Sequence, residues 1–306
     1  MQNTLKSPAS FTGRGLHHGA PVRMVVGPAP VDHGIWFRRT DVTDRDALVP
    51  ARWDAVSQSR LCTVIENADG VSVSTIEHIM AALAGFAINN ALIEIDGPEV
   101  PILDGSSVPF IEGFLDAGIE EQDLPVRAVR ILKPVEVRDG AAVARLEPAE
   151  MLEIAFRIDF DDAAIGVQER KLNMANGAFV RELCNSRTFC RQADVDAMRA
   201  NGLALGGTLE NAVVFDGDRV LSPGGLRHAD EPVRHKMLDA VGDLALAGGP
   251  ILGRYVGERA GHALTNRLLR ALFADPSAHE LVDCGPRTLG KLPGVGVHAG
   301  DLPARA

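Results

Sequence analysis

The chain has 306 residues, 46% of them hydrophobic, and carries a net charge of −10. This length and composition are typical of a globular protein with a sizeable core, arranged as two ordinary domains or one large one. The negative charge argues against bulk binding to nucleic acid or to an anionic membrane, although a few local Arg and Lys residues could still bind a small anionic substrate.

The sequence predicts a cytoplasmic protein without stable membrane insertion. None of its apolar runs reaches the roughly 18–20 residues that a membrane-spanning helix needs. The N-terminal stretch MQNTLKSPASFTGRG lacks the apolar core of a secretory signal. The cysteines are scattered without a CxxC pair, as is typical of a reduced protein; they are Cys62, Cys184, Cys190 and Cys284.

The first part of the chain predicts both strands and helices. Strands are expected where apolar residues alternate or are β-branched, over 21–29, 34–42 and 90–102. Residues 61–75 predict a hairpin that turns at Asp69-Gly70. Apolar residues at helical spacing predict two helices, one over 74–88 with Gly85 as its C-cap and one over 104–118 ending at Gly118.

An acidic stretch over 120–130, which contains Pro125, predicts a domain boundary, and we place the two domains at 1–124 and 125–306. The second half begins again with predicted strands, over 129–140, 141–149 and 152–160. Helical patterns follow over 178–202, 231–247 and 262–274. Because each half combines strands and helices in a similar way, we expect two α+β domains of related design.

The helix predicted over 231–247 carries a polar stripe within a mostly apolar sequence. His235, Asp239 and Asp243 follow one another at four-residue intervals, which places them on one face of a helix. Two further ionisable clusters stand in apolar, helical context, Glu77-His78 and His262. Burying a carboxylate is costly unless it is paired or binds a metal, so the three clusters together indicate a functional site.

Two imidazoles and one carboxylate, with water in a fourth position, form a catalytic zinc site. His235 and Asp239 have the spacing that lets one helix supply two ligands, and His78 is the natural third ligand. Glu77 beside it could act as a general base. Each motif also has a structural interpretation. Ser74-x-x-Glu77 matches a capping box, an HxxxD pair can simply support a helix, and a lone histidine is commonly a core residue.

His262 follows a glycine at the start of a predicted helix, where the helix dipole disfavours a protonated imidazole. A general acid at this position would need a carboxylate nearby to hold its proton, and Asp243 would serve that purpose. In the structural alternative, Asp243 lies on the surface and His262 is an ordinary helix residue.

Seven segments occur in an order and spacing that resemble one family. They are GRGLHHG, STIEHIMAALAG, IDGPEVPILDGSSVPF, NSRTFC, LGGTLENAVVFD, RHKMLDAVGDLALAG and GHALTNRLLRAL. Together they resemble the bacterial UDP-3-O-acyl-N-acetylglucosamine deacetylases, which catalyse the committed step of lipid A biosynthesis. The resemblance runs from about residue 3 to residue 275, and residues 276–306 carry no motif that we can interpret.

The resemblance implies a fold and a reaction. The fold would be two similar α+β domains, each a mainly antiparallel sheet with helices, with the helix layers sandwiched between the two sheets. The reaction would be zinc-dependent hydrolysis of the acetamide of UDP-3-O-acyl-N-acetylglucosamine, releasing acetate and UDP-3-O-acyl-glucosamine. Fe²⁺ suits similar ligands, so the metal loaded in the cell stays open. We expect a monomer.

Carried over by position, the resemblance implies roles for individual residues. The residues of the reaction would be His78, His235 and Asp239 as zinc ligands, Glu77 as general base, His262 as electrostatic stabiliser or general acid, Asp243 as its partner, Thr188 at the oxyanion and Lys236 at the substrate. Whether Glu77 or His262 protonates the leaving amine stays open.

Further substrate contacts are implied around this centre. They are Phe189 at the sugar, Phe160 near the uridine, Arg259 at the diphosphate, Leu205 and Gly207 in a passage for the acyl chain, and His17 in the first motif. Leu205 and Gly207 could equally be part of a strand and turn core, and Arg259 could be a solvated surface charge. The chain departs from the family pattern at His18, expected at the surface, and at Cys190.

Two other functions fit the same residues. A zinc hydrolase of this fold could act on a different amide, which activity on substrates with and without an acyl chain would distinguish. A non-catalytic module could keep the fold and only bind nucleotide sugars or partners. Such a module would usually lose a ligand or the base, whereas Glu77, His78, His235, Asp239 and His262 are all present.

Overall fold

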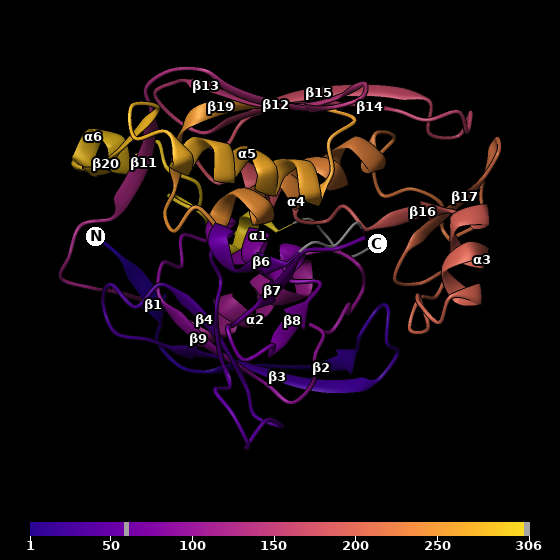
Figure 1. Cartoon of the computed structure of the whole chain (residues 1–306), viewed down its shortest axis with the longest axis horizontal. Coiled ribbons are helices and arrows are strands. Elements are labelled where there is room, and N and C mark those ends of the chain that lie inside the picture. The colour runs from indigo at the N-terminus through magenta and orange to yellow at the C-terminus, as the bar shows by residue number, and fades with distance from the viewer. Residues whose placement is uncertain (58–60, 303–306) are drawn as a thin grey trace.

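The computed structural model describes residues 1–57 and 61–302, and its sheets form two outer layers with helices between them (Figure 1). Within these residues the first layer is a five-stranded sheet of order β2-β3-β9-β4-β5. Its strands are β2 (Ala9–Arg14), β3 (Pro21–Pro28), β4 (Ile35–Arg39), β5 (Leu48–Pro50) and β9 (Ala91–Ile95). Alternate residues of β9 are buried, as expected for a sheet with one face against a core.

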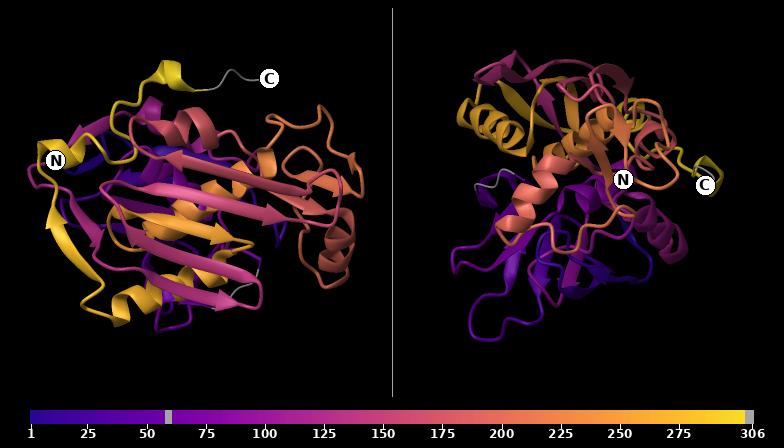
Figure 2. Two further views of the ribbon diagram at one scale, coloured as in Figure 1. Left: turned by 90° about the horizontal axis from the view of Figure 1, so that it is seen from above. Right: turned by 90° about the vertical axis from the view of Figure 1, so that its right-hand side faces the viewer.

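The second layer is a seven-stranded sheet in the described part of the chain, seen from above in Figure 2. Its central path is β12-β13-β19-β11-β20, and β14 pairs with both β19 and β15. The strands are β11 (Arg127–Ile131), β12 (Val135–Asp139), β13 (Ala142–Pro148), β14 (Glu153–Asp159), β15 (Val167–Asn173), β19 (Ile251–Glu258) and β20 (His279–Asp283).

Both layers are mainly antiparallel, so the predicted α+β class is confirmed. The parallel pairs are β4 with β9, β11 with β19 and β14 with β19. Shorter pairings complete the fold: β1 (Asn3–Leu5) with β10 (Ile119–Glu121), β6 (Val56–Ser57) with β7 (Val64–Glu66) and β8 (Ser72–Ser74), and β16 (Phe189–Arg191) with β17 (Val213–Asp216) and β18 (Arg219–Val220).

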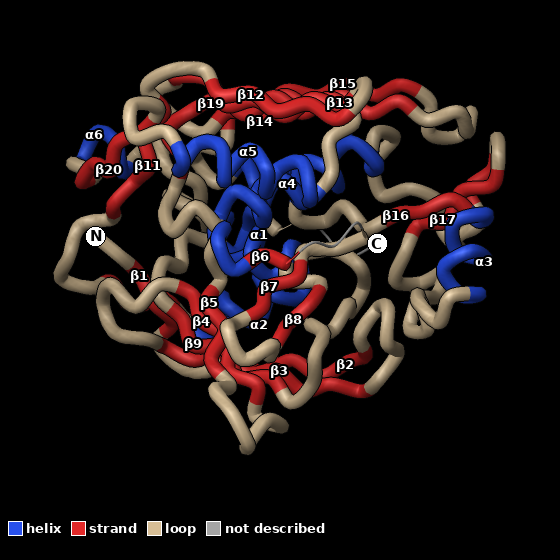
Figure 3. Tube along the Cα trace, in the orientation of Figure 1, coloured by secondary structure: helices blue, strands red, loops and turns tan. Residues whose placement is uncertain are grey.

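Helices fill the space between the two layers, and Figure 3 shows them enclosed by strands above and below. The enclosed helices are α1 (Glu77–Gly85), α2 (Val108–Ala117), α4 (Glu231–Ala245) and α5 (His262–Ala274). α3 (Gln192–Ala200) stands to one side beside β16 and β17, and α6 (Pro286–Leu289) lies near β20 (Figure 1). The layered arrangement expected from the family resemblance is therefore present.

The contact between α1 and α4 positions the functional residues. Gly242 lies near the C-terminal end of α4, and a Cβ at this position would overlap the backbone carbonyl of Glu77, the first residue of α1. Glycine therefore allows the two helices to approach more closely than any other residue would. As a result, the N-terminal turn of α1 lies directly against the C-terminal half of α4.

Several sequence expectations need correction. Gly85 is the last residue of α1 rather than its C-cap, and it is small because a Cβ there would overlap the ring of Phe179. The pattern over 178–202 is not one helix. It divides into a π-helical turn at Phe179–Leu183, strand β16 and helix α3. Periodicity missed β16 because a strand depends on a distant partner, here β17.

The structure separates the two sheets along the chain. Among the strands of the described residues, β10 is the last that pairs with the first 100 residues, whereas β11 already belongs to the second sheet. The boundary that we place between residues 124 and 125 falls in the connection between these strands and stays a prediction. Among the described residues, no helix combines the length and the apolarity needed to cross a membrane.

Candidate metal centre and active site

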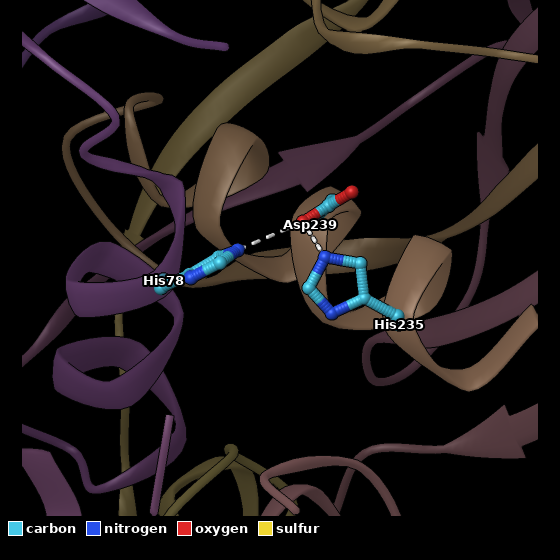
Figure 4. A group of neighbouring side chains, drawn as sticks. All are labelled: His78, His235 and Asp239. Atoms are coloured by element: carbon cyan, nitrogen blue, oxygen red, sulfur yellow. Dashed lines mark ion pairs between the residues drawn. The ribbon is translucent and has the colours of Figure 1, made fainter. Parts of the chain in front are cut away.

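Three side chains that offer metal ligands converge where α1 meets α4 (Figure 4). His78 is the second residue of α1, and His235 and Asp239 lie one turn apart on α4. Oδ1 of Asp239 lies 3.2 Å from Nε2 of His235 and 3.7 Å from Nε2 of His78. The ligand atoms of all three residues lie within 4.8 Å of one another, and all three residues are buried.

The chemistry of this group suits a divalent cation. Oδ1 of Asp239 is buried and has no hydrogen-bond partner in the described part of the chain. Nδ1 of His235 lies 3.0 Å from the carbonyl oxygen of Ser186, so Nδ1 donates and Nε2 is left with its lone pair. Burial and the neighbouring His235 lower the pKa of His78 to about 3, which keeps this imidazole neutral, as a metal ligand must be.

Asp239 is held in its ionised form. Burial opposes ionisation, but the neighbouring ammonium group of Lys236 helps to hold the pKa of Asp239 well below its usual range. Nζ of Lys236 donates to Oδ2 of Asp239 over 2.7 Å, which leaves Oδ1 facing the two imidazoles. The centre therefore offers two neutral nitrogens and one anionic oxygen, the donor set of a catalytic zinc site.

Glu77 is not a helix cap. The hydroxyl of Ser74 donates to the carbonyl of Pro98, and the residue before α1 makes no side-chain capping bond. The carboxylate of Glu77 instead accepts a hydrogen bond from the backbone N–H of Thr63, 3.0 Å from Oε2. Burial raises the pKa of Glu77 to about 7, so the group can exchange a proton near neutral pH.

His262, the first residue of α5, pairs with Asp243 on α4. Their Nδ1 and Oδ2 atoms lie 2.9 Å apart. Burial alone would lower the pKa of His262, but Asp243 and Glu77 raise it to about 9. Nε2 of His262 lies 3.9 Å from Oε1 of Glu77 and 3.9 Å from Oδ2 of Asp239. A protonated imidazole therefore lies beside the buried carboxylate of Glu77 and the metal ligands.

A buried ion pair supports the segment behind His235. Arg187 donates from its side chain to Glu231 over 2.9 Å, and its backbone N–H donates to the same carboxylate. Glu231 opens α4, so this pair ties Ser186 and Thr188 to the helix that carries the ligands. The support fixes the carbonyl of Ser186 that orients His235.

A cavity of about 710 Å³ opens onto the centre. Its lining includes most of the residues expected to contact substrate: His17, Phe160, Thr188, Phe189, Gly207 and Lys236. Phe189 contacts both Phe160 and the metal centre. Its ring centroid lies 5.6 Å from that of Phe160 and 6.3 Å from that of His235. The strand β16 and helix α3, which the periodicity of the sequence does not separate, form much of the lining of this cavity.

Two expected contacts lie elsewhere. Leu205 is 58% exposed and is not part of the cavity lining in the described residues, although its backbone N–H donates to the carbonyl of His17. Arg259 pairs with Asp159 at the surface, outside that lining. Arg259 follows β19 directly and has a positive φ of 49°.

Sequence reasoning missed residues that hold the site together. The buried carboxylate of Glu99 accepts hydrogen bonds from the backbone N–H groups of His17 and His18 and from the hydroxyl of Thr75. His18 is exposed, as expected, and its ring also bonds Glu99. Thr63 contacts both Glu77 and Asp243. Glu99 stands in a recognised motif, but no sequence pattern marks Thr63.

The geometry defines a class of protein. Two imidazoles and a carboxylate, beside a buried glutamate of raised pKa and a protonated histidine, form the site of a metal-assisted hydrolase. The family model of UDP-3-O-acyl N-acetylglycosamine deacetylase matches residues 2–274, and the chain belongs to this family.

Curated relatives match over nearly the whole chain. A UDP-3-O-acyl-N-acetylglucosamine deacetylase from Phenylobacterium zucineum is 53% identical over 278 residues, which cover 91% of this chain and 95% of the relative. Proteins of the same name from Shewanella frigidimarina and Xanthomonas axonopodis pv. citri are 46% and 47% identical over 284 residues. Those two matches cover 92% of this chain and 92% and 93% of the relatives, respectively.

Proposed function

We propose that this protein hydrolyses the acetamide of UDP-3-O-acyl-N-acetylglucosamine, releasing acetate and UDP-3-O-acyl-glucosamine, the committed step of lipid A biosynthesis. Zn²⁺ is the proposed metal, held by His78, His235 and Asp239. The observation that carries the proposal is the convergence of these three ligands beside Glu77 in a buried site. Family membership and the names of the relatives support the choice of substrate.

The chain supplies the proton transfers. A zinc ion at this centre would lower the pKa of a water molecule and polarise the acetamide carbonyl. Glu77 takes the proton of the attacking water, which its raised pKa suits. The hydroxyl of Thr188, on the cavity wall, donates to the developing oxyanion. His262 stabilises that negative charge, and either His262 or the newly protonated Glu77 protonates the leaving amine.

The cavity supports an extended substrate. Lys236 and His17 contact its polar part, while Phe189 and Phe160 line the sugar and uridine positions. Gly207 and several apolar residues of the cavity lining face the acyl chain. These apolar residues are Val195, Met198, Ala204 and Ala212. Arg259 and Leu205 stand outside this lining, so their substrate contacts stay predictions without support from the described geometry.

The two other functions make different demands. A hydrolase of another amide would have no use for a long apolar wall, so loss of activity on a substrate without the acyl chain favours the deacetylase. A binding module would not need Glu77 and His262 to be aligned with three metal ligands. The cytoplasmic location, the monomeric state and the choice of Zn²⁺ over Fe²⁺ stay predictions.

Acetate release tests the proposed function. Purified protein is incubated with UDP-3-O-acyl-N-acetylglucosamine before metal removal, after chelation and after Zn²⁺ is restored. We expect turnover, loss of turnover in the chelated protein and recovery with Zn²⁺. Inactivity with Zn²⁺ demonstrably bound would point to another amide substrate. Inactivity without any metal binding would indicate that His235, Asp239 and Asp243 have only a structural role.

The pH dependence of kcat/KM should be bell-shaped. Glu77 must be ionised to accept a proton, so activity falls as the pH drops through about 7. His262 must be protonated to stabilise the oxyanion or donate, so activity falls as the pH rises through about 9. Initial rates between pH 5 and 10.5 check both limbs, and a profile that is flat over this range would mean that neither group titrates in the limiting step.

A further inference from the structure

Thr63 contacts both acid–base groups of the site. It precedes β7 and is 3% exposed. Its backbone N–H donates to Oε2 of Glu77 over 3.0 Å, and its hydroxyl donates to Oδ1 of Asp243 over 2.5 Å. The other oxygen of Asp243, Oδ2, lies 2.9 Å from Nδ1 of His262. One residue therefore connects the base to the partner of the histidine.

The hydroxyl of Thr63 controls a degree of freedom that the His262 contact leaves open. A carboxylate bonded through one oxygen can still rotate about its terminal torsion, because such torsions are broad. In the described residues, the second oxygen of Asp243 meets the hydroxyl of Thr63, so both oxygens are engaged. Two bonds from different directions define the plane of the carboxylate and thereby the direction in which His262 points.

We propose that Thr63 is a positioning residue for the reaction, a role that rests on the proposed function. Its hydroxyl fixes the carboxylate of Asp243 so that Nε2 of His262 faces Glu77 and Asp239. The backbone N–H of Thr63 holds the carboxylate of Glu77 through its hydrogen bond to Oε2. Thr63 and Glu77 come from the first half of the chain, before β9, whereas Asp243 and His262 lie on α4 and α5 in the second half. Thr63 therefore aligns groups contributed by both halves of the chain.

Thr63→Val separates the two contacts. Valine has the shape of threonine and keeps the backbone N–H that holds Glu77, but it cannot donate to Asp243. A hydrogen bond to a charged group contributes enough free energy to change a rate about ten- to hundredfold. We expect kcat to fall by that factor with KM and zinc content unchanged. Thr63→Ser keeps the hydroxyl and should restore kcat to within about threefold of the unaltered protein.

Thr4→Val is the matched control. Thr4 is also buried, and its hydroxyl donates to the carbonyl of Asn90 over 2.8 Å and accepts from the N–H of Ala29, outside the cavity lining. Removing this hydroxyl should change thermal stability but not kcat. If Thr63→Val and Thr4→Val lower kcat equally, Thr63 has only a structural role and the proposal is wrong.

A double-mutant cycle tests whether Thr63 acts through Asp243. Asp243→Ala alone should already remove the effect of the Thr63 hydroxyl on kcat, because the carboxylate that accepts its hydrogen bond is gone. Adding Thr63→Val should therefore lower kcat no further. Multiplicative losses in the double variant would show that the hydroxyl acts independently of Asp243 and would overturn the proposal.

A spectroscopic readout separates this inference from the proposed function. In protein labelled with ¹⁵N-histidine, the Nδ1–H signal of His262, assigned by its loss in His262→Gln, should broaden or shift upfield in Thr63→Val but not in Thr63→Ser. An unchanged signal overturns the positioning role even if acetate is released. An altered signal supports it even if the unaltered protein proves inactive on this substrate, a result that would contradict only the proposed function.

Discussion

Replacing Glu77 by alanine is expected to lower acetate release by about two orders of magnitude or more, the scale associated with loss of a general base. The effect should fall on kcat rather than on metal binding, because Glu77 is not one of the three ligands. Steady-state kinetics with UDP-3-O-acyl-N-acetylglucosamine, together with metal analysis of the same preparation, check both parts. Zinc content should match that of the unaltered protein.

Two further variants test whether the loss of activity is specific to the carboxylate of Glu77. Glu77→Gln keeps the shape of the side chain and its acceptor oxygen for the N–H of Thr63, yet it cannot accept the proton of water, so it should be nearly as slow as Glu77→Ala. Glu66→Ala, at an exposed position of the neighbouring strand β7, should leave kcat unchanged. Full activity in Glu77→Ala would remove Glu77 from the mechanism and leave His262 as the remaining candidate for proton transfer.

Replacing His235 by alanine should abolish stable zinc binding, and turnover should be lost with it. The variant removes one of two imidazoles and leaves the buried carboxylate of Asp239 without its neighbour at 3.2 Å. Three-ligand sites depend on each donor, so the remaining His78 and Asp239 should hold the metal only weakly. Zinc stoichiometry after dialysis, measured beside acetate release, gives the answer. Stoichiometric zinc in this variant would contradict the assignment of His235 as a ligand.

The controls for this variant address folding. His235→Gln preserves more of the side-chain volume and should also lose zinc, so agreement between the two variants excludes a simple cavity effect. His33→Ala removes a partly buried histidine in the loop before β4, outside the cavity lining, and should retain both zinc and turnover. Thermal unfolding of each metal-free variant shows whether the fold persists when the metal does not bind.

Local patterns in the sequence were enough to predict much of this protein. The four-residue spacing of His235, Asp239 and Asp243 predicts a common face, because the period of a helix is an intrinsic property of the backbone. The predicted helix over 262–274 coincides with α5, and Gly118 ends α2 with a φ of 74° as a glycine C-cap should. These features depend on residues that are close together in the chain, so the sequence contains the information directly.

Choices between equally good local interpretations needed the tertiary structure. Ser74-x-x-Glu77 reads as a capping box until the fold shows Ser74 bonded to Pro98 and Glu77 bonded to Thr63. The helical pattern over 178–202 hides strand β16, because its partner β17 lies more than twenty residues further along the chain.

The site itself is the clearest example of this division. Thr63 and Asp243 are 180 residues apart, and no periodicity relates them. Their contact depends on the close approach of α1 and α4, which Gly242 allows by having no Cβ to meet the carbonyl of Glu77. Helical spacing is set by the backbone of one segment and can be read along the chain. The pairing of base, acid and metal ligands is set by how segments pack, and packing is decided only when the whole chain has folded.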